Sequence, residues 1–362
     1  MSQALPPTMS TANAAPLPAA GVPQITIQTG SSWLLRILCG LGWLGCLVFL
    51  ALFLGLSFGL SQYFDTTGGI QEKYHSGAKY GRDKVAVITI DGAILHGSGF
   101  VKQQIDRVRE DKDVKAVVVR VNSPGGTITG SDYIHHHLVK LRQEKQVPLV
   151  VSMGGIAASG GYYLAMAVGD TERSIYAEPT TTTGSIGVIV PHYDLSGLLS
   201  RFQIQDDSIV SHPRKQLMAM TKPISDEDRQ ILQVYVDDAF ARFKDIIRSG
   251  RPVFRQAPEK LDELATGEIF SARQAKDHGL VDELGFIEDA IERAMELAGL
   301  NSARTRVVEF EPPPSLFDLP FLSAAESRTS PLGLILDLNT PQAYYLATTL
   351  PPLVTQRSAE RW

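Results

Sequence analysis

The sequence predicts an α/β domain with a mainly parallel sheet, preceded by one transmembrane helix. Between residues 84 and 300, short apolar runs alternate with amphipathic segments, and no internal repeat is visible. A long uncharged apolar segment comes before this region. Apolar runs rich in β-branched residues are typical of strands that are covered on both faces, as in parallel sheets. Three such runs are residues 85–90, 116–121 and 148–152.

The N-terminal region divides into three parts. Residues 1–32 carry no charged side chain and are rich in Pro, Ala, Ser and Thr, which predicts a disordered segment. Residues 37–60 are almost wholly apolar and would rise roughly 36 Å as a helix, enough to cross a hydrocarbon core. They are longer than the apolar region of a signal peptide and show no polar stripe. We therefore predict a transmembrane anchor over residues 33–62 and a stalk over residues 63–83.

The alternating region, residues 84–300, is the predicted catalytic domain. Ser225 and the three acidic residues after it are a strong N-terminal signal for a long helix. A composition change at three consecutive prolines separates the domain from a Pro-rich tail, which we place at residues 301–362. Helices are expected over residues 99–111, 128–145, 160–168, 193–202, 225–249 and 286–299.

Charge and cysteine content limit the possible partners and compartments. The net charge is -5 and no long basic run occurs, so we expect no nucleic-acid partner. Cys39 and Cys46 both lie in the apolar segment, and the absence of other cysteines does not decide the compartment. The basic residues on the two sides of that segment are too few and too distant to fix its orientation.

Ser159 is the main candidate for a catalytic residue. It lies at a strand-to-helix junction, with Gly154 and Gly155 before it and Gly160 and Gly161 directly after it. Bare backbone amides beside a serine suit a nucleophile that needs an oxyanion hole. The alternative is a glycine-rich turn that only packs tightly.

Two further motifs have possible chemical roles. Residues 122–126, Asn-Ser-Pro-Gly-Gly, connect a strand to a helix, and glycine there can leave an amide free to face a ligand. Lys215 precedes an apolar stretch and can act as a general base if burial lowers its pKa. In the absence of other signals, the first motif is a common turn and the second a solvated surface lysine.

Taken together, these motifs resemble one family. The segments Asn122-Ser-Pro-Gly-Gly126, Ala157-Ala-Ser-Gly-Gly-Tyr-Tyr163 and Thr183-Gly-Ser-Ile-Gly-Val188 occur in the order seen in SppA-type signal peptide peptidases. These are membrane-anchored serine proteases with a ClpP/crotonase-like fold. Residues 267–275 and 279–285 resemble the closing helical part of that family. The resemblance covers about residues 84 to 300 and fits the short, single-domain form.

The resemblance implies a Ser/Lys dyad. Ser159 matches the nucleophile and Lys215 the general base, while Ser185 matches the serine that orients the lysine. Gly126 and the amide of Gly160 would stabilise the oxyanion. An uncharged amine then replaces the His-Asp pair of other serine proteases.

One departure from the family pattern concerns the base. Lys215 is followed by Gln-Leu-Met-Ala-Met, where the family usually has an acidic or amide residue and then Gly-Ser-Pro. Lys222 is therefore the runner-up base. The resemblance also implies hydrolysis of membrane-derived peptides such as cleaved signal peptides, an extracytoplasmic catalytic domain, a homo-oligomer and no cofactor.

Other interpretations remain open at the level of sequence. The same fold serves crotonase-type acyl-CoA enzymes, which need no nucleophile, and the chain is also compatible with a non-catalytic membrane scaffold. His192 and His212 are candidates for the histidine of a rival triad. The run of three histidines at 135–137 predicts no metal site, because consecutive helical residues point about 100° apart.

Overall fold

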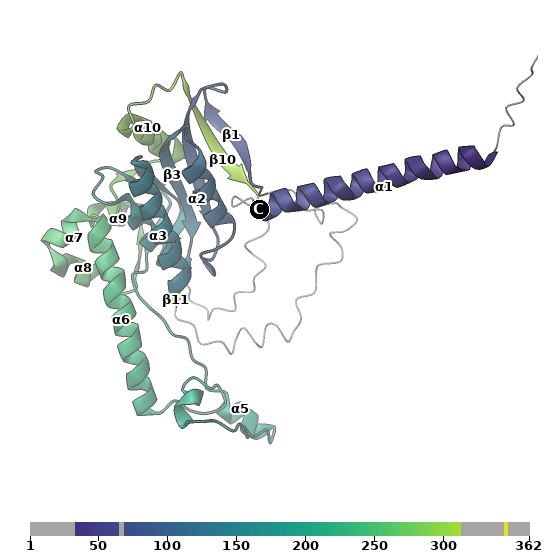
Figure 1. Cartoon of the computed structure of the whole chain (residues 1–362). Coiled ribbons are helices and arrows are strands. Elements are labelled where there is room, and N and C mark those ends of the chain that lie inside the picture. Colours follow the sequence, from purple (N-terminus) through teal and green to yellow (C-terminus); the bar gives the residue numbers. More distant parts are fainter. Residues whose placement is uncertain (1–32, 65–68, 313–343, 347–362) are drawn as a thin grey trace, which may run out of the picture. The chain divides into compact units, whose positions relative to one another are not determined.

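The computed structural model describes residues 33–64, 69–312 and 344–346 (Figure 1). Its contacts divide the chain into two units, Met1–Ser61 and Gln62–Trp362. The predicted disordered segment, residues 1–32, lies outside the described residues. In the first unit, all described residues belong to the helix α1 (Trp33–Phe64).

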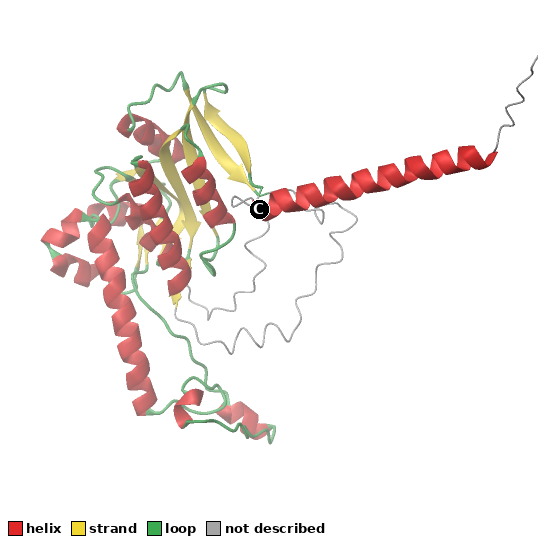
Figure 2. Ribbon diagram, viewed as in Figure 1, coloured by secondary structure: helices red, strands yellow, loops and turns green. Residues whose placement is uncertain are grey.

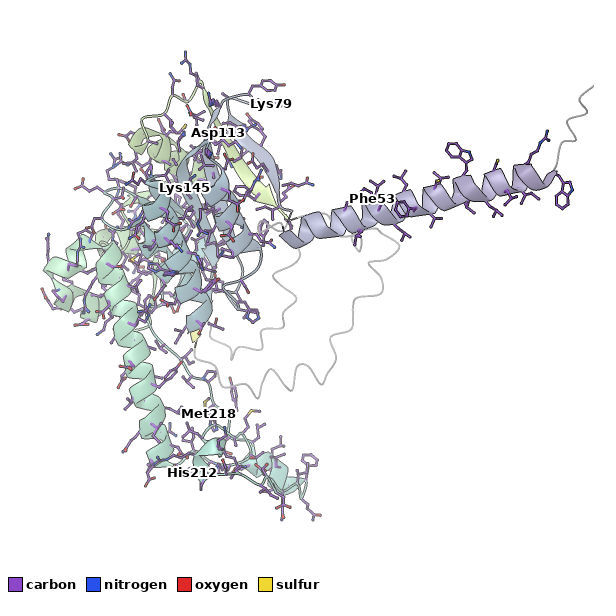
Figure 3. All side chains as sticks on the ribbon, viewed as in Figure 1. Phe53, Lys79, Asp113, Lys145, His212 and Met218 are labelled. Atoms are coloured by element: carbon purple, nitrogen blue, oxygen red, sulfur yellow. The ribbon has the colours of Figure 1, made fainter. Side chains whose placement is uncertain are left out.

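The helix α1 carries exposed apolar side chains along its length. Trp43, Phe49 and Phe53 are all more than half exposed, and Phe53 is labelled in Figure 3. Within the described part of the chain, Arg36–Ser57 is the one helical stretch long and apolar enough to cross a membrane. A helix that is apolar all round needs a non-aqueous environment.

The second unit is built on a nine-stranded, mostly parallel sheet (Figure 2). The main path runs in the order β1-β10-β2-β3-β5-β6-β9, and β7 pairs with both β5 and β8. Only β1–β10 and β7–β8 are antiparallel pairs within this sheet as described. The strands are β1 (Gln71–Gly77), β2 (Asp83–Asp91), β3 (Val114–Ser123), β5 (Leu149–Ala158), β6 (Ile175–Ala177), β7 (Thr182–Gly184), β8 (Ile269–Ser271), β9 (Glu283–Leu284) and β10 (Thr305–Glu311).

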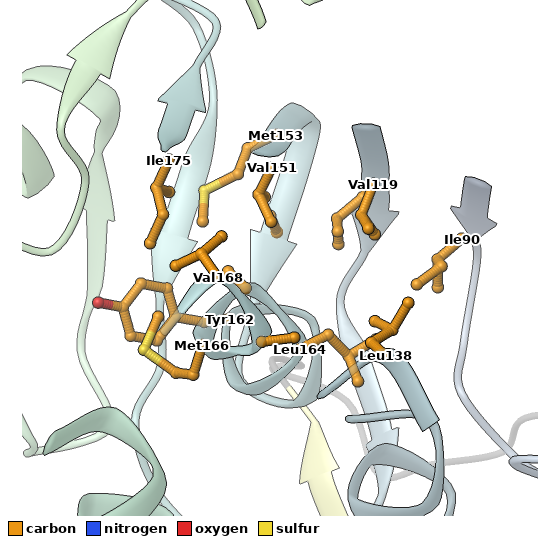
Figure 4. Packing of buried hydrophobic residues seen from close by; sticks show 14 of the residues in the cluster. Ile90, Val119, Leu138, Val151, Met153, Tyr162, Leu164, Met166, Val168 and Ile175 are labelled. Carbon is orange, nitrogen blue, oxygen red and sulfur yellow. The ribbon is translucent and has the colours of Figure 1, made fainter. Parts of the chain in front are cut away.

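The sheet separates two apolar clusters, because successive residues of a strand point to opposite faces. Ile88 and Ile90 of β2 join the larger cluster, whereas Val85 and Val87 join the smaller one. The helix α10 (Ile287–Leu297) contributes to the smaller cluster. The helices α2 (Phe100–Glu110), α3 (Ile128–Lys145) and α4 (Gly160–Ala165) contribute to the larger one. Figure 4 shows Tyr162, Leu164, Met166 and Val168 packed under the strands.

These observations confirm the α/β class, and each predicted helix is present. The helices α5 (Ser196–Arg201) and α6 (Asp226–Gly250) correspond to two of them, and Ser225 caps α6 by accepting a bond from the amide of Asp228. Two short helices were not predicted, because five to seven residues make no readable helical period. They are α7 (Pro252–Gln256) and α8 (Pro258–Leu264). The short helix α9 (Ala272–Asp277) overlaps residues 267–275, where the family resemblance indicated a helical part.

The folded domain extends past residues 84–300 at both ends. The strand β1 lies in the expected stalk and pairs with β10, which lies in the expected tail. Most side chains of β1 are polar, and four of its seven residues are exposed, so it lacks the apolar pattern of a covered strand. Its edge position explains why the sequence indicated no strand there.

A buried ion pair fastens the end of α6 to the sheet. Arg251 donates to Asp282 at 2.7 Å, and Asp282 also accepts bonds from the backbone amides of Ser174 and Ile175 at 2.9 Å each. We predict that Asp282→Ala lowers the free energy of unfolding by about 3 kcal/mol, because two backbone amides lose their acceptor and the buried guanidinium, still bonded to the carbonyl of Gly279, loses its carboxylate partner. Urea unfolding of the full chain in detergent measures this loss. The exposed Asp277→Ala is the control, expected within about 0.5 kcal/mol of the wild type.

Candidate active site

Ser159 lies in a strained turn between β5 and α4. Its φ of 53° and ψ of -115° are unusual for a residue with a side chain and cost about 1–3 kcal/mol. Its amide donates to Gly184 at 2.7 Å, and its carbonyl accepts from the amide of Tyr163 at 2.9 Å. The Oγ atom is buried and has no hydrogen-bond partner among the described residues. The fold therefore stabilises an unusual backbone conformation that leaves a serine hydroxyl available.

Close packing makes glycine necessary beside this serine. A Cβ atom on Gly160 would lie 2.4 Å from the Oγ atom of Ser131 and 3.2 Å from the amide nitrogen of Gly126. A Cβ atom on Gly126 would lie 2.0 Å from the carbonyl oxygen of Ile94. Gly160 of α4 and Gly126 of β4 (Gly125–Thr127) therefore pack together next to Ser159. First-turn amides of a helix have no acceptor within that helix, so the amide of Gly160 is one candidate donor to an oxyanion.

Ser185 is brought to the same end of the sheet. Ala158 and Gly184 are partners in the parallel pair β5–β7, so Ser159 and Ser185 are the next residues on two adjacent strands. Ser185 is also buried with a positive φ, 50°, and its amide donates to Glu268 at 2.6 Å. Ligand sites of parallel sheets lie at the carboxyl ends of strands, and both serines are there.

The candidate lysines occupy a different part of the unit. Lys215 is in the 3-10 turn η2 (Pro213–Gln216) and is exposed, and Lys222 is half-buried six residues after that turn. Because the Oγ atom of Ser159 has no partner, neither lysine of the described chain reaches it. Figure 3 labels His212 and Met218, which flank Lys215. The single chain thus brings together Ser159, Ser185, Gly126 and Gly160 but not a lysine.

Residues 211–222 carry both candidate lysines and are called the lysine segment here. Hydrogen bonds connect this segment to residues that precede it, and it also lies beside the start of α6. Leu195 donates its amide to Met220, and Thr221 donates to Asp206 at 2.5 Å. The nitrogen Nδ1 of His212 accepts from the amide of Arg214, and Nε2 of His192 contacts the carbonyl of Ala219. Both histidines therefore interact with the backbone of this segment and contact neither serine in the described structure. Arg214 lines a shallow hollow with four residues from the first turns of α6, which are Glu227, Gln230, Ile231 and Val234.

Sequence reasoning missed a polar network that joins α3, α4 and α6. Tyr163 and Arg242 each donate to the same carboxylate oxygen of Asp132 at 2.5 Å. Burial raises the pKa of Asp132, but the bonds from Tyr163 and Arg242 outweigh it and leave the pKa below its ordinary value. Tyr163 belongs to α4, which begins directly after Ser159. Of these three residues, only Tyr163 belongs to a sequence motif, the one at residues 157–163. The other two gave no signal, because contacts between helices leave no local sequence pattern.

His135 is buried beside this network. Its ring packs edge-on against Tyr163, with centroids 5.3 Å apart, and its Nε2 atom has no partner among the described residues. Burial lowers its pKa to about 4 from the ordinary 6.5, although Asp132 acts in the opposite direction. The neutral imidazole is therefore the form that the fold favours.

The α/β fold and a serine hydroxyl without a hydrogen-bond partner among the described residues, at two strand ends, agree with a serine hydrolase, and comparison with known proteins identifies the class. The profile of peptidase family S49 matches residues 141–301. Protease 4 of Salmonella typhi is 36% identical over 236 residues, which are 63% of this chain and 37% of that protein. A candidate protease of Synechocystis sp. is 37% identical over 235 residues, 65% of this chain and 82% of its own length. The chloroplastic serine protease SPPA of Arabidopsis thaliana is 32% identical over 263 residues, 68% and 38% of the two chains.

The chain belongs to peptidase family S49, the SppA-type family of serine proteases. This confirms the resemblance found in the sequence motifs, and the α/β fold agrees with it. The chain spans only 37% of Protease 4 and 38% of the Arabidopsis protein, but most of the Synechocystis protein.

The lowered pKa of His135 predicts a pH-dependent stability. The unfolded chain binds a proton at this site below pH 6.5, whereas the folded chain does so only near pH 4, so stability is lost as the pH falls through this window. We expect protonation of His135 to lower the free energy of unfolding by about 1–2 kcal/mol between pH 7 and pH 5. Urea unfolding at both pH values, for the wild type and His135→Gln, measures it. An equal pH dependence in both proteins would contradict the assignment.

Proposed function

We propose that the chain is a membrane-anchored serine endopeptidase that hydrolyses membrane-derived peptides, such as cleaved signal peptides, through an acyl-enzyme at Ser159. The observation that carries the proposal is the buried, unpaired Oγ atom of Ser159, in a strained turn beside the glycines of β4 and α4. A nucleophile needs both a hydroxyl that no other hydrogen bond engages and a preorganised place for the developing oxyanion. Membership of family S49 supports the same reaction class.

The reaction follows from these groups. The Oγ atom of Ser159 attacks the carbonyl carbon of the scissile bond as a neutral lysine amine takes the hydroxyl proton. The amides of Gly126 and Gly160 stabilise the oxyanion of the tetrahedral intermediate. The lysine then gives its proton to the leaving amine, and an ester at Ser159 remains. Water, deprotonated by the same lysine, hydrolyses that ester and restores the enzyme.

We assign the base to Lys215, oriented by Ser185, and supplied by a neighbouring copy of the chain. Ser159 has no lysine partner within its own described chain, and Lys215 is exposed. Several large apolar side chains around the lysine segment are exposed as well, a pattern typical of a surface that another protein covers. They are Leu198, Phe202, Ile204, Ile209, Val234 and Tyr235. Desolvation at such an interface disfavours a charged amine, and the mechanism needs an uncharged one. Lys222, which is half-buried, remains the runner-up base.

The anchor and the compartment complete the proposal. The stretch Arg36–Ser57 would span the bilayer and hold the peptidase domain near the membrane from which its substrates come. By the family resemblance, we place that domain on the extracytoplasmic side. The crotonase-type and scaffold alternatives differ in one respect that is easy to measure, since neither uses the hydroxyl of Ser159.

A mixing experiment tests the nucleophile and the shared dyad together. Ser159→Ala and Lys215→Ala should each lower the kcat for peptide hydrolysis by at least about 1,000-fold. Co-expression of the two variants in equal amounts should restore about a quarter of the sites, since each complete site needs one intact residue from each of two neighbours. In the matched control, Ser159→Ala is co-expressed with Lys222→Ala in place of Lys215→Ala.

The outcomes separate the alternatives. No recovery on mixing would place the dyad within one chain. If Lys215→Ala keeps full peptidase activity and Lys222→Ala loses it, the general base is Lys222. Activity that persists in Ser159→Ala would exclude the serine mechanism.

The packing around Gly160 gives a second test. Gly160→Ala should lower kcat by about 100-fold, because the new methyl group pushes α4 away from β4 and separates the two oxyanion amides. The nearest atom to that methyl group is the Oγ atom of Ser131, so Gly160→Ala combined with Ser131→Gly should recover part of the loss. Steady-state hydrolysis of a fluorogenic peptide measures both. A Gly160→Ala enzyme with unchanged kcat would contradict the oxyanion assignment.

A further inference from the structure

The strand β5 changes its neighbour just before Ser159. Its residues 151–153 pair with β6, whereas residues 156–158, which lead directly into Ser159, pair with β7. Against β3, three residues of β5, 154–156, lie between two paired positions where β3 has only Asn122. We call residues 154–156 the β5 bulge. A bulge bends its strand and re-aims the residues beyond it, so the conformation of the β5 bulge determines where Ser159 lies.

The side chain of Asn122 connects the β5 bulge to β2. Its Oδ1 atom accepts from the amide of Ile156 at 3.3 Å. Its amide group donates to the carboxylate of Asp91, which is its partner in the register of β2 and β3. Since the oxygen and the nitrogen belong to one planar amide, the bond to Asp91 orients the oxygen that holds Ile156. Both Asn122 and Asp91 are exposed, so burial in the apolar core does not explain their arrangement.

Further contacts hold the β5 bulge in place. A Cβ atom on Gly154 would lie 3.1 Å from a guanidinium nitrogen of Arg120 and 3.3 Å from the Cβ atom of Asn122, so glycine lets these side chains approach. Arg120 pairs with Glu178, the residue after β6, and Thr181 donates its hydroxyl to the carbonyl of Gly154 at 2.6 Å. The conformation of the bulge is therefore set by side chains from β2, β3 and the segment after β6.

We propose that Asn122, oriented by Asp91, is a positioning residue that fixes the β5 bulge and thereby the place of Ser159 relative to the oxyanion amides. The inference rests on the proposed function, since it takes Ser159 as the nucleophile. Gly126, one of the two proposed oxyanion donors, follows Asn122 by only four residues, so one short stretch of chain carries the donor and also holds the strand that ends in Ser159. A misplacement of about 1 Å between reacting groups can lower a rate by about 100-fold.

A reciprocal exchange in the full-length protein tests this pair. Asn122→Asp keeps an acceptor for the amide of Ile156, but it removes the donor to Asp91 and places two carboxylates side by side. We expect it to lower kcat for a fluorogenic peptide by about tenfold at unchanged KM, because the alignment of Ser159 is lost while substrate contacts remain. Adding Asp91→Asn exchanges the two groups, which restores the hydrogen bond, and should return kcat to within about threefold of the wild type.

A second asparagine provides the matched control. Asn301 is also exposed, and its Oδ1 atom also accepts a backbone amide, that of Ala303, at 2.9 Å. Asn301→Asp should therefore hydrolyse the peptide as the wild type does. Unchanged kcat in Asn122→Asp, or no recovery when Asp91→Asn is added, would overturn the proposal.

Hydrogen exchange provides a readout that does not need peptide hydrolysis. In the Ser159→Ala background, the amide of Ile156 should exchange about tenfold faster when Asn122→Leu is added, because it loses its acceptor. The amide of Val308 in the core of β10 should exchange at an unchanged rate, which shows that the fold is intact. Faster exchange at Ile156 in a protein whose wild type hydrolyses no peptide would retain Asn122 as the residue that fixes the bulge but refute the proposed function. Full peptidase activity with unchanged exchange at Ile156 would refute only the role of Asn122.

Discussion

The backbone conformation of Ser159 is the constraint on which the site depends. A left-handed φ at a residue with a side chain is unfavourable, and it persists because the surrounding structure holds both of its backbone groups. One bond runs to Gly184 of the neighbouring strand and the other begins α4. The parallel pair β5–β7 therefore fixes Ser159 and also places Ser185 at the adjacent strand end.

The same packing explains the distribution of glycine and the role of the helices. Glycine is required at positions 126 and 160 because β4 and α4 come closest there, and the amides of these two residues are the proposed donors to an oxyanion. The network of Asp132, Tyr163 and Arg242 then connects α4 to α6, the helix that begins beside the lysine segment. Ser159, Ser185 and the two glycines thus lie together within one chain, and the candidate lysine Lys215 is carried on an exposed segment with an apolar surface.

Much of this architecture could be predicted from sequence because its signals are local. The three apolar runs became β2, β3 and β5, and the helix expected at 128–145 is α3 with those bounds. The strand β1 gave no such signal, since an edge strand with polar side chains lacks apolar periodicity. The strand β11 (Tyr344–Leu346) gave none either, because three residues in a Pro-rich tail form a strand only through a distant partner. The motifs named Ser159 and Ser185 as candidate site residues, and their adjacency became visible only in the pairing of β5 with β7. A motif likewise identifies a lysine without giving its distance from the serine.

The central claim is that Ser159 acts with a lysine from an adjacent copy, and the separation between the two groups tests it most directly. An experimental structure of the assembled full-length protein, in detergent or lipid, would give the distance from the Oγ atom of Ser159 to each lysine amine. The account predicts Lys215 of a neighbouring copy within about 3.2 Å of that oxygen, with Ser185 bonded to the same amine. A nearest lysine amine at about twice that distance at every subunit pairing would contradict it.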